Sequence, residues 1–203
     1  MSAHDVFYKI WRFVRIPLAV VVVLLVGLTI YRFPYALEQR RAEEVVEFIR
    51  AQKITLNDVN GVNLPLAPDP AEVDATVEGV DANKNWIRDD VELAIFERYP
   101  NDARIRAAML QYAMGLQLEL TQVFNSETWV VAIQQTSRGY GCVYNNAGDN
   151  PIIFTMQKTE EIEKLVLNTD QRNSQYEKIE KFQRSFSILP GQDCDVRFDE
   201  LDA

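Results

Sequence analysis

The sequence predicts a mainly α-helical protein, with a single-pass transmembrane helix near the N-terminus and one small helical domain after it. Two observations lead to this fold class: an uncharged run covers residues 16–31, and apolar residues recur at helical spacing in several later segments. The 203 residues are 47% hydrophobic and 25% charged, with only eight Gly and eight Pro, which is typical of a folded protein. The part beyond the uncharged run, about 150 residues, is long enough to build one hydrophobic core.

The uncharged run is the predicted membrane anchor. Its 16 residues reach about 24 Å as a helix, and snorkelling of Arg15 and Arg32 extends this toward the roughly 30 Å of a bilayer core. We therefore expect a short cytoplasmic tail at residues 1–15 and an anchor at residues 16–33. The membrane partner would be a bacterial inner membrane.

Two other interpretations of this segment remain open, a cleaved signal peptide and a buried core helix. Residues 29–33 (TIYRF) contain no A-x-A-like cleavage site, and the near-continuous valine and leucine favour lipid over a protein core. Basic residues flank the uncharged run on both sides, so the distribution of Lys and Arg gives little indication of the orientation of the anchor in the membrane. The short N-terminal tail favours a cytoplasmic N-terminus and a large domain in the periplasm.

The two cysteines agree with an oxidising compartment. Cys142 and Cys194 both follow glycine-containing stretches, GYG before the first and PGQD before the second. A disulfide between them would stabilise the fold by about 4 kcal/mol through loop entropy. The alternative is two unrelated free thiols in a cytosolic domain, and sequence alone does not decide the pairing.

The domain downstream of the anchor divides into a juxtamembrane helix, a loop and a series of helices. Residues 34–52 form the juxtamembrane helix, with an apolar stripe on one face, and residues 53–203 form the extracytoplasmic helical domain. The proline- and asparagine-rich stretch before residue 80 predicts a loop. The predicted helices of the domain cover residues 89–99, 102–124, 126–139, 152–167 and 170–186.

One segment carries the spacing of a calcium loop, residues 81–92 (DANKNWIRDDVE). Counted from Asp81, oxygen-bearing side chains stand at positions 1, 3, 5, 9 and 12, and position 7 would offer a main-chain carbonyl. The segment resembles the EF-hand-like loop in its helix-poor form, typified by dockerin and thrombospondin type-3 repeats. The resemblance implies a structural Ca²⁺ ion and this ligand set: Asp81, Asn83, Asn85, Ile87 through its carbonyl, Asp89 through a water molecule, and Glu92.

The segment departs from the family at position 6, where Trp86 replaces glycine. That position normally has a positive φ, which costs a residue other than glycine roughly 1–2 kcal/mol. A second interpretation needs no metal: Asp89 and Glu92 match a helix capping box, and Lys84 and Arg88 would neutralise the acidic cluster. Both interpretations stay open from the sequence.

Charge and composition limit the function. The single histidine is His4, so the domain has no imidazole for Ser-His-Asp or Cys-His catalysis. The net charge of −9, with 17 Lys+Arg against 29 Asp+Glu in residues 33–203, argues against a nucleic-acid partner.

These limits favour a membrane-anchored, periplasmic, non-enzymatic domain that binds a protein partner, and an acidic surface suits a basic partner. An immunity- or inhibitor-type protein is one form of this function. Two alternatives remain: an envelope hydrolase that uses a carboxylate, and an accessory subunit of a membrane complex that docks through residues 7–52.

Overall fold

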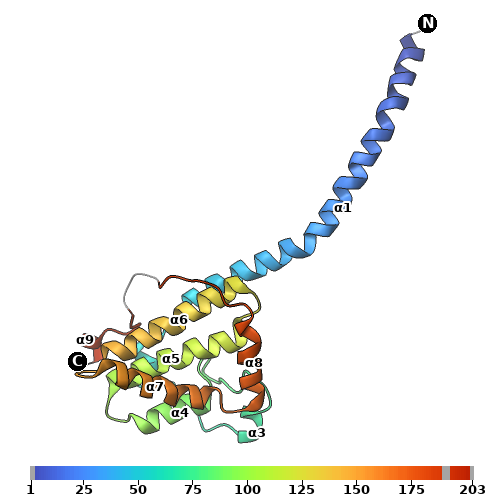
Figure 1. The fold of residues 1–203 in the computed structure, drawn as a ribbon. Helices are drawn as coiled ribbons and strands as arrows, with labels where there is room; N and C mark the ends of the chain where they lie inside the picture. The colour runs from blue at the N-terminus through green and yellow to red at the C-terminus, as the bar shows by residue number, and fades with distance from the viewer. Residues whose placement is uncertain (1–2, 189–192, 202–203) are drawn as a thin grey trace. The chain divides into compact units, whose positions relative to one another are not determined.

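The computed structural model describes residues 3–188 and 193–201 (Figure 1). Every regular element in these residues is a helix, which confirms the mainly α fold class. The predicted turn before Cys194 lies outside the described residues. The chain forms two compact units, Met1–Glu44 and Val45–Ala203, which are described separately below.

Helix α1, Ala3–Ala51, is one uninterrupted element of 49 residues. The sequence suggests that Pro17 lies in the first turn of the anchor and that a second helix resumes after Pro34. Instead both prolines lie inside α1. Each proline removes one intrahelical hydrogen bond, and the helix continues through both positions.

The apolar part of α1 has no protein covering it. Most of the large apolar side chains between Leu18 and Ile30 are at least 50% exposed, although they are valines, leucines and isoleucines. The Thr29 hydroxyl donates to the Leu25 carbonyl at 2.8 Å, which satisfies this polar group inside the helix. Among the described residues, α1 is the one helix long and apolar enough to cross a membrane.

The second unit is built around helix α5, Ala103–Gln122, which is buried along almost its whole length. Helices α6 and α7 pack along it, and α4, α8, α2 and α9 also contact it (Figure 1). The bounds of these surrounding helices are α2 Leu56–Val59, α4 Asp89–Arg98, α6 Ser126–Asn145, α7 Pro151–Val166, α8 Asp170–Glu180 and α9 Phe198–Leu201. One further short helix, α3 (Pro70–Val73), lies in the segment that the sequence predicts as a loop.

Two predicted helix ends are wrong. Helix α6 continues through Gly139 and Gly141 to Asn145, whereas the sequence predicts an end near Gly139. A Cβ atom at Gly139 would lie 2.7 Å from the backbone of Tyr112 on α5, so this glycine allows close helix contact and does not end the helix. Helix α8 ends at Glu180, six residues before the predicted end at Phe186.

The disulfide between Cys142 and Cys194 is present, which confirms the predicted pairing. It joins α6 to the segment before α9, so Cys142 lies in a helix and not in the predicted turn. The disulfide is not alone in holding the C-terminal segment: the Gln111 side chain donates to the Asp193 carbonyl at 2.7 Å and accepts from the Asp195 amide at 2.8 Å. Arg138 forms an ion pair with Asp195.

Candidate functional site

Two of the predicted ligand side chains, Asn83 and Asn85, converge on Glu92, the residue at position 12. Glu92 is 1% exposed, and each of its carboxylate oxygens accepts one amide hydrogen bond. The Asn83 Nδ2 atom donates to Oε2 at 2.9 Å, and the Asn85 Nδ2 atom donates to Oε1 at 3.1 Å. Positions 3, 5 and 12 of the predicted ligand set therefore lie together.

Asp81 and Asp89 fold the segment around this centre. The two carboxylate oxygens of Asp81 accept from the backbone amides of Asn85 and Trp86, at 3.2 and 3.0 Å. The Asp89 carboxylate accepts from the Ala82 amide at 3.0 Å, across the loop. These bonds turn the chain through a tight loop that holds both ends close together.

Ile87 connects the loop to the core. Its side chain is 1% exposed and belongs to the hydrophobic core, while its amide donates to Asn85 Oδ1 at 2.9 Å. The loop therefore cannot shift without moving a core residue.

The capping-box interpretation of Asp89 and Glu92 is wrong. Helix α4 begins at Asp89, so Arg88 occupies the N-cap position and makes no side-chain cap bond. Asp89 uses its carboxylate for the loop amide of Ala82, and Glu92 faces the asparagines. Both carboxylates thus accept hydrogen bonds from the loop and do not cap helix α4.

Trp86 keeps the positive φ that position 6 of such a loop requires. Its φ is +64°, and Lys84 two residues earlier has a φ of +59°. The indole ring of Trp86 packs edge-on against Phe48 in the last turns of α1, with ring centroids 4.8 Å apart. The departure from glycine therefore leaves the backbone course intact, because the tryptophan ring gains a packing partner.

The three carboxylates of the predicted ligand set have raised pKa values. The pKa of Glu92 is raised to about 7, mainly by burial and in smaller part by Asp58 and Asp89, against the hydrogen bonds from the two asparagine amides. Burial also raises the pKa of Asp81 and of Asp89, against the hydrogen bonds that their carboxylates accept from backbone amides. A cation at this point would remove the cost of holding these carboxylates ionised.

Within the described part of the chain, Arg88 neutralises Asp90 in the acidic cluster, in agreement with the metal-free interpretation, but forms no ion pair with the predicted ligands Asp81, Asp89 and Glu92. Its guanidinium is fully buried and forms an ion pair with Asp90, with Nη2 and Oδ2 2.9 Å apart. It also donates to the carbonyls of Leu165 and Val166 at the end of α7. Lys84 does act on Asp81, where its charge opposes the rise in pKa.

A second buried arginine extends this network. Arg172 on α8 donates to the carbonyls of Val73, Thr76 and Val77 and to the carboxylate of Asp74. Asn168 accepts from both arginines, at 3.2 Å from Arg88 and 2.7 Å from Arg172. Local sequence does not predict the bonds of Arg88 to the end of α7 or of Arg172 to residues 73–77, because these partners are between 77 and 99 residues away in the sequence.

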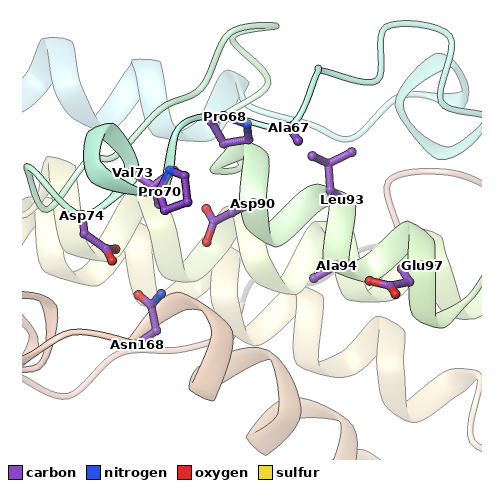
Figure 2. A pocket seen from close by; sticks show the side chains of 10 residues that line it. All are labelled: Ala67, Pro68, Pro70, Val73, Asp74, Asp90, Leu93, Ala94, Glu97 and Asn168. Atoms are coloured by element: carbon purple, nitrogen blue, oxygen red, sulfur yellow. The ribbon is translucent and has the colours of Figure 1, made fainter.

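An open groove of about 380 Å³ lies beside this network (Figure 2). Its acidic members are Asp74, Asp90 and Glu97, and its apolar members include Pro68 and Leu93. Buried arginines pair with Asp74 and Asp90 from the protein side, and Glu97 is exposed. The groove thus combines apolar surface with carboxylates. One of these carboxylates, Asp90, belongs to the loop segment, residues 81–92.

The donor set of the loop suits a hard cation, since it consists of carboxylates, amides and main-chain groups. Across residues 3–188 and 193–201, no group of three or more His, Cys, Asp and Glu side chains is arranged as a metal cluster. Three of the six predicted ligands, Asp81, Asp89 and Glu92, are carboxylates, and they do not form such a group; the other three are two asparagines and one carbonyl. No protein-family model, curated protein or solved structure matches this chain.

Proposed function

We propose that residues 81–92 bind one Ca²⁺ ion and that this ion stabilises a membrane-anchored domain. The observation that carries the proposal is the convergence of Asn83 and Asn85 on the buried carboxylate of Glu92. Glu92 presents both oxygens to the same point, which is the bidentate arrangement that a calcium loop takes from its last position.

The asparagine amides occupy the place that the ion would take. Each donates an N–H to Glu92, and rotation of the amide group would bring its oxygen to the same position. Calcium binding would thus replace these two hydrogen bonds, and those that the two amide oxygens accept from the Asn85 and Ile87 amides, with ionic contacts to Glu92, Asp81 and the two amide oxygens. With three carboxylates and a strained loop, we expect a dissociation constant between micromolar and millimolar, as in extracellular modules.

The melting temperature of the full chain in detergent tests this site. We expect 5 mM calcium to raise it for the wild type and to have no effect on Glu92→Gln, which keeps the shape but loses the charge. Glu160→Gln is the matched control, because Glu160 lies on the solvated face of α7 and pairs with Lys164. An equal calcium shift in all three proteins would contradict the proposal.

The anchor and the disulfide support a placement of the domain in a bacterial periplasm. Helix α1 contains a segment that can span the inner membrane at residues 16–33, and a Cys142–Cys194 disulfide persists in an oxidising compartment. In this arrangement the tail at residues 1–15 is cytoplasmic. The periplasm would also supply calcium at a concentration matched to a weak site.

We propose further that the groove in Figure 2 binds a basic segment of a protein partner. The exposed carboxylate of Glu97 favours positive charge. Buried arginines already balance the charge of Asp74 and Asp90, whose oxygens remain possible hydrogen-bond acceptors, while Pro68 and Leu93 offer apolar contact. Because Asp90 lies next to the ligand Asp89, calcium would fix the groove as well as the loop. An inhibitor of a basic envelope protein and a subunit of a membrane complex would both use such a surface.

Affinity purification from membranes tests the groove. Ala94→Arg places a long cationic side chain in it, and Gln157→Arg adds the same charge to an exposed position on α7. We expect the wild type and Gln157→Arg to retain the same partner, Ala94→Arg to lose it, and a calcium chelator to weaken its retention. Equal retention by both variants would show that the partner binds elsewhere.

A carboxylate-dependent hydrolase receives less support from the geometry. Glu119 has a pKa raised to about 7 by burial, as a general acid requires, and it lines a cavity. That cavity has a volume of about 120 Å³, whereas substrate pockets are typically about 300–1,000 Å³. The cavity at Glu119 is therefore too small for the substrate of such a hydrolase.

A further inference from the structure

Glu119 is a buried carboxylate in the middle of the core. It lies on α5, is 1% exposed, and its Oε1 atom has no hydrogen-bond partner among the described residues. Thr136 on α6 provides a side-chain hydrogen bond to the carboxylate. A buried polar atom without a partner is costly, so its presence calls for a ligand or a water molecule.

Glu119 lines a cavity of about 120 Å³ between α5, α6 and α8. Two aromatic residues, Trp129 and Tyr176, form part of its wall, and Ile179 adds apolar surface. Glu180 also lines the cavity and is exposed, so the cavity reaches solvent at the end of α8. Trp129 is held in place by an edge-on contact with Phe186, at 5.8 Å between ring centroids.

The charges that act on this cavity are negative. Glu163 on α7 raises the pKa of Glu119, and Glu119, Glu163 and Glu180 all raise the pKa of Tyr176, after burial as the main cause. Glu163 accepts a hydrogen bond from Tyr112 at 2.7 Å. A ligand that enters here therefore meets a negative potential and two aromatic side chains, which together favour a cation with an apolar body.

We propose that the cavity binds one small organic ammonium ion, with its positive charge beside Glu119 and its carbon atoms against Trp129 and Tyr176. The size sets an upper limit on the ligand. A core cavity of about 150 Å³ holds benzene, with six heavy atoms, so a cavity of about 120 Å³ suits an ion of roughly five. A water molecule would satisfy Glu119 Oε1 but would leave the negative charge uncompensated.

Calorimetric titration of the full chain in uncharged detergent at pH 8 tests this proposal. The probe is tetramethylammonium chloride, with sodium chloride matched in ionic strength, and the neutral control is tert-butanol, which has the same number of heavy atoms. We expect saturable binding of tetramethylammonium with a dissociation constant in the millimolar range and none of tert-butanol. Absence of saturable binding, or equal binding of tert-butanol, would overturn the proposal.

Two variants and a control connect the binding to this cavity. Glu119→Gln keeps the shape and removes the charge, and we expect binding at least about tenfold weaker. Tyr176→Leu keeps the charge and removes an aromatic wall, and we expect a loss of about fivefold. Glu177→Gln, at an exposed position on the same helix, should bind as the wild type does. Wild-type affinity in a folded Glu119→Gln protein would place the ion elsewhere and refute the assignment.

Discussion

Trp86 combines backbone strain with side-chain packing. A residue other than glycine pays roughly 1–2 kcal/mol for the left-handed region, and Trp86 has a φ of +64°. Its edge-on contact with Phe48 adds about 0.5–1.5 kcal/mol beyond the apolar area that both rings bury. The packing therefore offsets the strain, and the loop keeps its course without the glycine that the family uses.

Glu119 makes the stability of the domain depend on pH. Burial raises its pKa from 4.5 to about 7. Between pH 4.5 and pH 7 the folded chain therefore keeps a proton on Glu119, whereas the unfolded chain has released it. Stability therefore falls as the pH rises through this window, and Glu92 acts in the same direction without calcium. We predict that Glu119→Gln raises the free energy of unfolding at pH 8 by on the order of 2 kcal/mol, as measured by urea denaturation in the absence of organic cations.

The same experiment at low pH provides the control. Below pH 4.5 both states of the wild type are protonated at Glu119, so Glu119→Gln should have nearly the wild-type stability there. Glu177→Gln, on the exposed face of α8, should follow the wild type at every pH. If Glu119→Gln and the wild type lost stability with pH to the same extent, Glu119 would not be the group responsible.

At the scale of elements, buried arginines join segments that are distant in the sequence. Arg172 ties α8 to residues 73–77 through three carbonyls and Asp74, and Arg88 ties the start of α4 to the end of α7. Such bonds add polar contacts to the apolar packing of Val73 and Val77 in the segment before residues 81–92. The loop is thus supported from α7 and α8 as well as from its own side chains.

Removal of the Arg172 guanidinium should be strongly destabilising. Arg172→Met preserves the apolar stem but leaves several buried carbonyls without a donor, so we predict a loss of about 3–5 kcal/mol in the free energy of unfolding. Arg98→Met is the comparison, because Arg98 is partly exposed and pairs with Glu161, and its loss should be below about 1 kcal/mol. Urea denaturation measures both, and equal losses would contradict the role of Arg172.

The disulfide also joins elements that are distant in the sequence. Cys142 and Cys194 are 52 residues apart in the sequence, and a loop of this length predicts a stabilisation of about 4 kcal/mol. We predict that the double variant Cys142→Ser, Cys194→Ser loses stability by this order in denaturation experiments. Because Gln111 and Arg138 also bind the C-terminal segment, the variant should keep its helix content in circular dichroism.

The element boundaries show what a sequence can predict. Apolar stripes predict α4, α5 and α7 to within two residues, because each stripe faces the core directly. The end of α6 is mispredicted because Gly139 and Gly141 are typical of turns, whereas here they allow close contact with Tyr112 and Asp193.

Local spacing predicts the loop residues from Asp81 to Glu92. It does not reveal Arg88, Arg172 or Glu119, whose burial depends on distant segments.

At the scale of the whole molecule, charge is unevenly distributed along the chain. Residues 1–32 contain four basic residues and one acidic residue, and the remainder contains 17 Lys+Arg against 29 Asp+Glu. The apolar side chains of α1 between these parts are exposed, and a lipid bilayer is the environment that would cover them. This distribution is the one expected for an anchored acidic domain.

Membrane fractionation tests the anchor. We predict that the full chain stays in the membrane pellet after carbonate extraction and enters solution only with detergent. A variant with Val22, Leu25 and Val26 all changed to lysine places three charges in the apolar stretch, and it should appear in the soluble fraction. Release of the wild type by carbonate alone would contradict an integral anchor.

The central claim is that residues 81–92 hold one calcium ion, and equilibrium dialysis of the full chain against radioactive calcium measures this directly. We predict one ion per chain with a dissociation constant between micromolar and millimolar. Asp81→Ala and Glu92→Gln should each abolish this binding, and Glu160→Gln should retain it. The account predicts that the wild type saturates at one ion per chain and that neither loop variant binds calcium. Absence of bound calcium at millimolar concentration, or full binding by Glu92→Gln, would contradict the account.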